Sequence, residues 1–580
     1  MHKLSFNNIF YVLAFFFPAV IFYEILMYGS FIPEHDYWDN FVGMLSGDGF
    51  LGLFSPQNEH LQVIAKLAYR ANMYFFDGHD MPLKLSIYFV AFLQVYILYK
   101  MLLETFECDF KRALGFFVVA SYSFTPFAIN NFIAGMSGTV WIYANFFSIL
   151  AFYCFFNRKN HWGYNLGFVL ACICAPLCHT TGVFILPSLA TAYFFAYRPS
   201  LFKTLMILLS ASLAFVLYYL FVYSDIENPA ELIESSSVLL PVILLTFLMS
   251  GMVIGSIILS AIVAAFIYYA LLKGVFFLWK SSDILENEKS IFWLAIAIFS
   301  GVFILSIGVT RYEFYKSHYI FISRYQTLPA LMFISAFILY IRNKTLDTKL
   351  KIVISLATIL AVLITYVQSY KTHMDVFRSS HEYNNLNSYS LLMRDVFINN
   401  LYNRKFFLEI EPERKAKLDF GAVKYLKQYN NIPYNQKYWN KCHKTINSGS
   451  VAREVNQATE IVNAKLYDPK DENFHSGYLE VILKSPINKK VPDWECILLL
   501  DSDKKIIGGG NKVKYLSDFY DEKEKSGDEL WRAFFAKSEY LLLTEISLLA
   551  YIKGTGEAFI YKLAMDDSSL LSASEGENKN

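Results

Sequence analysis

The stretch IFYVLAFFFPAVIFYEILMYGSFIPEHDYWDN, residues 9–40, joins a long apolar run to a short acidic one. A helix of about 20 apolar residues crosses the roughly 30 Å hydrocarbon core of a bilayer. The sequence therefore predicts a membrane span at 9–30. Lys3 precedes this span and no small-residue cleavage pattern follows it, so we expect a retained anchor rather than a removed signal peptide.

The composition continues this pattern along the first part of the chain. The protein has 580 residues, 55% hydrophobic and 17% charged, with 51 Lys and Arg against 50 Asp and Glu. These values exclude a soluble globular enzyme, a disordered chain and a basic nucleic-acid binder. Residues 1–369 carry 21 basic and 20 acidic residues, whereas 370–580 carry 30 of each. We predict a polytopic helical membrane domain at 1–369, an extramembrane domain at 370–565 and a disordered tail at 566–580.

The apolar runs predict eleven membrane-spanning helices. They lie at 9–30, 83–103, 113–130, 138–156, 164–179, 181–197, 204–223, 255–279, 291–309, 326–341 and 352–369. The segment 239–254 contains Pro241 and Gly251 and is predicted to be re-entrant or interfacial; a full extra span there would invert the downstream topology. With a cytoplasmic N-terminus, fifteen Lys and Arg residues of this half lie inside and six outside, which favours that orientation.

The outer loop at 31–82 concentrates acids beside the membrane, which indicates a functional site. Glu34, Asp36 and Asp39 follow the first span, and Asp36 and Asp39 are three residues apart, so they face the same way on a helical turn. Glu59 comes later in the loop. The alternative is that these acids are helix caps and solvated charges.

The same loop continues into a predicted amphipathic helix. Its apolar positions recur at helical spacing over 61–75, with Lys66, Arg70 and Asn72 among the polar positions between them. This pattern is typical of a helix that lies on the membrane surface.

The outer loop RYEFYKSHYIFISRY, residues 311–325, supplies the complementary charge through Arg311, Lys316, His318 and Arg324. Arginine binds phosphate oxygens bidentately and lysine adds a point charge, so this loop is the best candidate for a phosphate site. The alternative is that these side chains snorkel to lipid headgroups within an aromatic belt.

Five of the seven cysteines lie in or beside predicted spans: Cys108, Cys154, Cys172, Cys174 and Cys178. On a helix Cys172 and His179 share one face, whereas Cys174 and Cys178 share roughly the opposite one. We therefore expect packing rather than a zinc site. Cys442 and Cys496 lie in the outer domain and would form one disulfide in an oxidising compartment.

Strand-like runs in the outer domain predict a small β-sandwich or an α/β domain. They lie at 477–485, 496–501, 505–510, 540–552 and 558–563. Trp494 and Trp531 are candidates for stacking on sugar rings, although we favour a place in the core for both.

The acidic first outer loop, the many spans and the later basic outer loop together resemble the GT-C superfamily of polytopic glycosyltransferases. More closely, NEH at 58–60, HTTGVFILP at 179–187 and SRY at 323–325 are similar to bacterial membrane proteins of the protein-mannosyltransferase-like branch. The resemblance covers residues 5–370. The chain has no WWDYG-type motif, which argues against an oligosaccharyltransferase. It also has no second acidic pair in a later outer loop, so the need for a divalent cation stays open.

The resemblance implies an inverting enzyme of the bacterial inner membrane, with its C-terminal domain in the periplasm. It would move a sugar from a polyprenyl-phosphate donor to a glycan, lipid or protein acceptor of the cell envelope. The general base would be Asp36, with Asp39, Glu34 or Glu59 as further candidates. The basic loop would stabilise the leaving phosphate. We expect Trp38, His60 and Tyr325 to contact the sugar or the acceptor.

The sequence leaves two alternatives to a glycosyltransferase. An O-antigen polymerase or ligase also works on polyprenyl-linked glycan at the outer face, but we expect it to depend more on outer-loop arginine. A flippase or transporter for lipid-linked glycan would place charges and paired broken helices at the midplane, and the sequence has few ionisable residues inside its spans. The interrupted segment 239–254 is the feature that favours a transporter.

Overall fold

The computed structural model describes two regions of the chain. In the first it describes residues 6–29, 51–54, 61–133, 135–197, 239–251, 257–280, 284–310, 325–342 and 349–370. In the second it describes residues 456–467, 478–484, 494–504, 506–513, 530–536, 547–552 and 558–566. The chain divides into two units, one with residues 1–29, 35–71 and 81–374 and the other with 30–34, 72–80 and 375–580.

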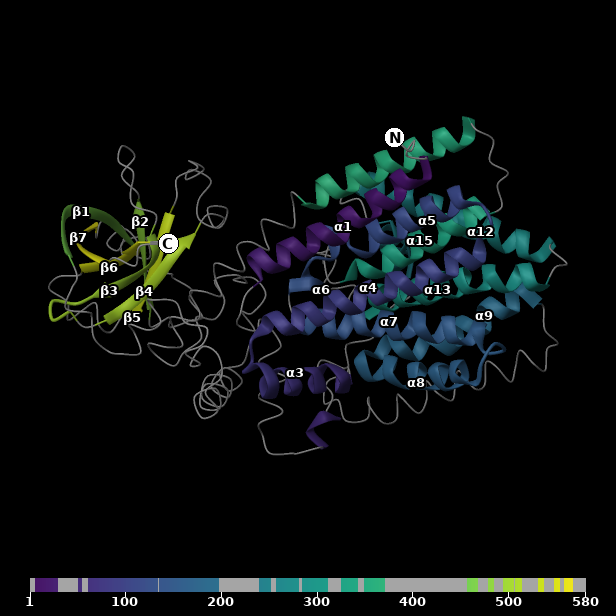
Figure 1. Ribbon diagram of the computed structural model, residues 1–580, viewed down its shortest axis with the longest axis horizontal. Coiled ribbons are helices and arrows are strands. Elements are labelled where there is room, and N and C mark those ends of the chain that lie inside the picture. Colours follow the sequence, from purple (N-terminus) through teal and green to yellow (C-terminus); the bar gives the residue numbers. More distant parts are fainter. Residues whose placement is uncertain are drawn as a thin grey trace. The chain divides into compact units, whose positions relative to one another are not determined.

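The first region is helical (Figure 1). Its α-helices are α1 (Phe6–Tyr28), α3 (Val63–Phe76), α4 (Asp80–Thr105), α5 (Asp109–Ser123), α6 (Asn130–Ile133), α7 (Gly135–Asn157), α8 (Trp162–Cys178), α9 (Ile185–Tyr197), α11 (Leu239–Ser250), α12 (Ile257–Lys280), α13 (Ile284–Thr310), α15 (Thr327–Arg342) and the helix Lys349–Tyr370. The short 3-10 helices are η1 (Leu51–Leu53), η2 (Pro126–Ala128) and η3 (Thr180–Phe184).

Six of the described helices are long and apolar enough to cross a membrane. Their spans are Asn7–Met27, Asp80–Thr105, Ser137–Asn157, Ile257–Lys280, Glu288–Gly308 and Lys349–Tyr370. Trp162–Cys178, Thr180–Phe195 and Thr327–Arg342 are shorter apolar helices. The chain is thus a multi-pass helical membrane protein. The total of eleven spans stays a prediction, because the segment predicted at 204–223 lies outside the described residues. The span predicted at 113–130 is not one helix, since it is divided among α5, η2 and α6.

The segment predicted to be re-entrant contains α11, which has 12 residues. At 1.5 Å per residue this helix is about 18 Å long, too short to cross the bilayer alone. A Cβ atom at Gly251 would lie 1.8 Å from the carbonyl oxygen of Ser260. Only a residue without a side chain allows the end of α11 to approach α12 this closely.

Burial separates inner helices from outer ones. α13 and α7 lie side by side (Figure 1), and on α13 the wholly buried Trp293 donates its indole N–H to Thr105 Oγ1 at 2.9 Å. In contrast, α12 and Lys349–Tyr370 expose large apolar side chains, such as Ile258 (74% exposed) and Leu356 (62%). A continuous apolar surface of this kind is unfavourable in water and suits contact with acyl chains.

Positive side chains collect at one end of the bundle, where α7 and α15 end and α5 and α13 begin; we call it the basic end. Lys111 Nζ donates to the carbonyl of Arg342 at 3.1 Å, and Arg342 donates to the hydroxyl of Ser290. Lys159 pairs with Glu288 at 3.1 Å. These contacts tie together four helix ends.

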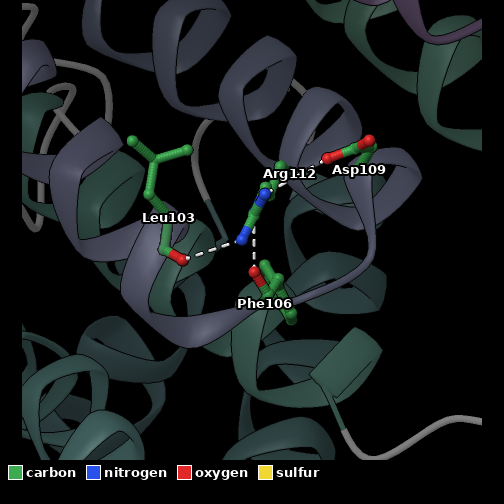
Figure 2. A network of polar contacts seen from close by, with 4 residues as sticks. All are labelled: Leu103, Phe106, Asp109 and Arg112. Carbon is green, nitrogen blue, oxygen red and sulfur yellow. Dashed lines mark hydrogen bonds and ion pairs between the residues drawn. The ribbon is translucent and has the colours of Figure 1, made fainter.

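Arg112 joins α4 to α5 at the same end (Figure 2). Its guanidinium donates to the carbonyls of Phe106 at 2.6 Å and Leu103 at 3.3 Å, and pairs with Asp109 at 3.2 Å. Carbonyls at the C-terminal end of a helix lack intrahelical donors. Arg112 satisfies them, so this polar network closes a tight helix connection and is structural.

The described strands of the second region form one closed barrel. They are β1 (Asn456–Tyr467), β2 (Tyr478–Lys484), β3 (Trp494–Leu500), β4 (Ile506–Val513), β5 (Leu530–Ala536), β6 (Ser547–Ile552) and β7 (Ala558–Asp566), in the spatial order β1-β2-β5-β4-β3-β6-β7. β1 and β7 close the barrel in parallel, with Asn456 opposite Phe559, and the other neighbours are antiparallel.

The barrel differs from the predicted sandwich in how the strands pair. Alternation of apolar residues indicates a strand and its buried face, but it does not report which strand lies next to which. The predicted runs match β2, β3, β4, β6 and β7, whereas β1 and β5 are not predicted. Inside the barrel Cys496, Leu498 and Leu500 of β3 pack with Leu549 of β6. Cys496 is disulfide-bonded, and Cys442 lies outside the described residues.

Candidate functional site

Most residues predicted to form the site lie outside the described residues. These are the acids Glu34, Asp36, Asp39 and Glu59, the sugar contacts Trp38 and His60, and the phosphate ligands Arg311, Lys316, His318 and Arg324. Tyr325 is described, and so are the helix ends that flank both predicted loops. Those helix ends therefore define the candidate site.

The flanking helix ends meet at one end of the bundle, which we call the loop end. A Cβ atom at Gly29, directly after α1, would lie 2.8 Å from Met81 Cε near the start of α4. Trp141 near the start of α7 packs edge-on against Tyr325, with ring centroids 5.0 Å apart. The Tyr69 hydroxyl of α3 bonds Thr139 Oγ1 of α7 at 3.0 Å. Since α7 and α15 run from here to the basic end, the two ends lie on opposite sides of the bundle.

Four rings from four elements form an aromatic cluster at the loop end: Trp141, His179, Phe303 and Tyr325. The centroid of Trp141 lies 4.2 Å from that of His179 and 5.3 Å from that of Phe303. Trp141 is 8% exposed and His179 is 2% exposed. Tilted and edge-on ring pairs of this kind hold one another in a fixed geometry. The cluster thus fixes Tyr325, the residue directly after Arg324 in the sequence.

His179 joins α8 to η3 and caps the 3-10 helix. Its Nδ1 accepts the backbone N–H of Thr181 at 3.3 Å. A nitrogen that accepts carries no proton, so the neutral ring holds its proton on Nε2. Gly182 packs against the last turn of α8, where a Cβ atom would lie 2.2 Å from Pro176 N. Within the described part of the chain, no three His, Cys, Asp or Glu side chains gather as metal ligands, Cys172, Cys174 and Cys178 included.

Partly buried hydrogen bonds link α7 to other helices. Asn145 Nδ2 donates to Thr327 Oγ1 at 3.0 Å, at the start of α15. Tyr143 OH bonds Ser86 Oγ of α4 at 2.8 Å. A buried polar group without such a partner costs free energy, so these pairs specify how α7 sits against its neighbours.

Two lysines near the loop end are buried: Lys66 of α3 is 3% exposed and Lys84 of α4 is fully buried. Lys66 Nζ donates to the carbonyl of Gly52 at 3.2 Å. Burial, with a smaller effect of Arg70, lowers the pKa of Lys66 from 10.5 to about 8. A weakly solvated ammonium group attracts an anion more strongly than a surface lysine does.

The buried Lys66 lies on the side of α3 that faces the protein. The sequence predicts an interfacial helix in which Lys66 is one of the polar residues. In the structure the Lys66 side chain is buried, whereas the apolar side chains of Leu67 and Phe75 are 47% and 70% exposed. A helix in water buries its apolar side, whereas a helix at a membrane can present that side to lipid and turn its polar side toward the protein.

Glu24 is a buried acid that the sequence did not single out. It lies within α1, is 1% exposed, and its Oε1 accepts the Tyr370 hydroxyl proton at 2.8 Å. The signal in the sequence was a lone carboxylate inside an otherwise apolar run, because such residues are costly in a membrane and seldom occur without a role.

Comparison of the chain with models of known protein families gives no match, and comparison with curated protein sequences gives none either. The fold and the loop end by themselves define a class. The protein is a multi-pass helical membrane protein with a β-barrel in its C-terminal region. Its loop end contains two buried lysines, an aromatic cluster, and the flanks of an acidic and a basic segment.

Proposed function

We propose that the protein is an inverting glycosyltransferase of the GT-C kind. It would move a sugar from a polyprenyl-phosphate donor to a glycan, lipid or protein of the cell envelope, at the periplasmic face of a bacterial inner membrane. The observation that supports this proposal best is the meeting of helix ends at the loop end. The flanks of the acidic segment and of the basic segment lie there together, joined through α7 by the Tyr69–Thr139 and Trp141–Tyr325 contacts.

The residue types fit each part of the reaction. The acceptor oxygen attacks the anomeric carbon as the bond from that carbon to the phosphate oxygen breaks, and the phosphate leaves with the electron pair. Asp36 takes the acceptor proton, with Asp39, Glu34 or Glu59 as further candidates. Arg311, Lys316 and Arg324 stabilise the charge that grows on the phosphate. A single displacement inverts the configuration at the anomeric carbon.

The described residues support this scheme in two ways. Lys66 and Lys84 place two buried amino groups near the loop end, and lysine amino groups are hydrogen-bond donors that bind phosphate oxygens. Tyr325, held by Trp141, offers an aromatic surface of the kind on which sugar rings stack.

The test is sugar transfer by the purified full chain. Radiolabelled polyprenyl-phosphate sugars would be offered as donors and cell-envelope extract as acceptor. We expect Asp36→Asn to lower the transfer rate by about 10²- to 10⁴-fold while donor binding persists, as loss of a general base does. Glu288→Gln is the matched control, because Glu288 pairs with Lys159 at the basic end and should leave transfer unchanged. Absence of transfer with every donor, or full activity of all four acid variants, would contradict the proposal.

Transport of lipid-linked glycan is the second candidate, and Glu24 is the observation that favours it. Ionisable residues buried inside spans often belong to transport pathways. Movement of a fluorescent polyprenyl-phosphate glycan across proteoliposomes would reveal such an activity. If wild type moves this lipid and Glu24→Gln does not, while no sugar is transferred, transport replaces the glycosyltransferase.

A further inference from the structure

One face of α12 carries lysines and aromatic rings in alternation at the basic end. Tyr269, Lys273, Phe276 and Lys280 follow at intervals of four, three and four residues, so all four lie on the same side of the helix. Tyr269 and Phe276 are each 55% exposed, and Lys280 is exposed as well. We call these four residues the α12 stripe.

The rings hold the two ammonium groups. Lys273 Nζ lies 5.7 Å from the centroid of Tyr269 and 6.0 Å from that of Tyr340 on α15. Lys280 Nζ lies 4.5 Å from the centroid of Phe276. Contacts between a cation and a ring face restrict a lysine without neutralising its charge. Both charges therefore stay available to an anion.

No described carboxylate pairs with either lysine of the α12 stripe. Two other cations of the basic end do pair with carboxylates: Lys159 with Glu288 and Arg112 with Asp109. At 1.5 Å per residue, the seven residues from Lys273 to Lys280 separate the two charges by about 10 Å along the axis. Two positive charges with no carboxylate partner among the described residues attract anionic headgroups beside a membrane, each lysine by about a factor of five in affinity.

The same face becomes apolar beyond the stripe. Ile258 (74% exposed), Ile262 (60%) and Ala265 continue the helical spacing toward the other end of α12. From Ile262 to Lys273 the helix rises about 16 Å, close to half of the roughly 30 Å hydrocarbon core. The face thus offers charge at headgroup level and apolar side chains over the length of one acyl chain.

From this match we propose that the α12 stripe, with Tyr340, binds an anionic diacyl phospholipid. The phosphate lies between Lys273 and Lys280, and the acyl chains follow Ile258, Ile262 and Ala265. The site is separate from the loop end and does not depend on the proposed glycosyl transfer. The partner is a lipid of the surrounding membrane, not a soluble phosphate compound.

The experiment counts lipids bound to the delipidated full chain by native mass spectrometry. Dioleoyl phosphatidylglycerol is the probe, and dioleoyl phosphatidylcholine is its zwitterionic match with identical chains. We expect tighter binding of the anionic lipid, and a loss of about fivefold for Lys273→Gln and about thirtyfold for Lys273→Gln/Lys280→Gln. Arginine at both positions should restore binding, which shows that the charge, and not the fold, is responsible.

Lys100→Gln/Lys351→Gln is the matched control. Lys100 and Lys351 also lie over rings, Tyr96 at 5.6 Å and Phe110 at 5.7 Å, but on other helices. The control should bind phosphatidylglycerol as wild type does. Equal affinity for the two lipids, or equal losses in the control and the stripe variant, would mean that the lysines only snorkel and would overturn the proposal. Displacement of the lipid by millimolar sodium phosphate would also overturn it, because the site would then be a general anion site.

Discussion

The ammonium group of Lys66 lies buried in α3, with its pKa lowered from 10.5 to about 8. The physical cause is desolvation, which disfavours the charged form, and Arg70 adds a like charge in the same direction. In the unfolded chain the group keeps its ordinary pKa. Between pH 8 and 10.5 the unfolded state therefore binds more protons than the folded state, and the contribution of Lys66 to stability rises with pH.

We expect this rise to disappear in Lys66→Met. Relative to the variant, the free energy of unfolding of wild type should increase by about 3 kcal/mol between pH 8 and pH 10.5, since a tenfold change in the proton-binding constant corresponds to about 1.4 kcal/mol. Unfolding in detergent micelles at several pH values measures it. Lys159→Met is the control for the loss of a lysine side chain at an exposed position. A flat difference for Lys66→Met would show that its pKa is ordinary.

At the scale of the element, the junction of α8 and η3 depends on a missing side chain. A Cβ atom at Gly182 would lie 2.2 Å from Pro176 N and 2.3 Å from Ala175 C, both backbone atoms that cannot move aside cheaply. We expect Gly182→Ala to lower the free energy of unfolding by about 1–3 kcal/mol. Thermal unfolding, monitored through the reactivity of the buried cysteines, would measure this loss of stability.

Gly301→Ala in α13 is the matched control for Gly182→Ala. A Cβ atom there would lie 3.5 Å from the flexible Met332 Cε, which is ordinary contact, and alanine favours a helix over glycine. Gly301→Ala should therefore be neutral or stabilising. Similar melting temperatures for the two variants would mean that the α8–η3 junction yields more easily than its geometry indicates.

The Tyr370–Glu24 hydrogen bond joins the helix Lys349–Tyr370 to α1. The ring of Tyr366 adds packing against Phe17 at 5.2 Å. Removing one member of a buried hydrogen bond costs about 1–3 kcal/mol. We expect Tyr370→Phe and Glu24→Leu each to destabilise the protein by that amount, and the double variant by clearly less than the sum. Additive losses in a double-mutant cycle would show that the two side chains act independently.

At the scale of the whole molecule, cysteine chemistry separates the two regions of the chain. Cys496 in the barrel is disulfide-bonded, whereas Cys108, Cys154, Cys172, Cys174 and Cys178 are free. Disulfides form in oxidising compartments, so this contrast supports a C-terminal region outside the cytoplasm. The orientation itself stays a prediction that rests on the positive-inside count.

We expect Cys496 to resist alkylation in intact cells until a reductant is added, and Cys442, its partner predicted from the sequence, to behave in the same way. Mass spectrometry of the alkylated protein measures both. Cys496→Ser should lower the stability of the C-terminal region by about 2–4 kcal/mol, because the cross-link restricts the unfolded chain. Labelling of Cys496 without reductant would contradict the disulfide and remove this support for a periplasmic location.

Much of the helical architecture could be predicted from apolar run length, since a span needs about 20 apolar residues wherever it packs. The helices α1, α4, α7, α12 and α13 lie where the runs predict them. The candidate site was less predictable. The acidic and basic loops stand out in the sequence, but His179 looked like a metal ligand or packing residue and proves to be a helix cap within a ring cluster.

The sequence by itself determined that this is a membrane protein with a separate β-rich region, because hydrophobic length and strand alternation are local properties. Only the tertiary structure decided which helix ends meet, that Lys66 and Glu24 are buried, and that β1 and β7 close a barrel. The physical reason is that burial and pairing depend on contacts between residues far apart in the chain. A lysine in an amphipathic pattern carries no sign of which side its neighbours will cover.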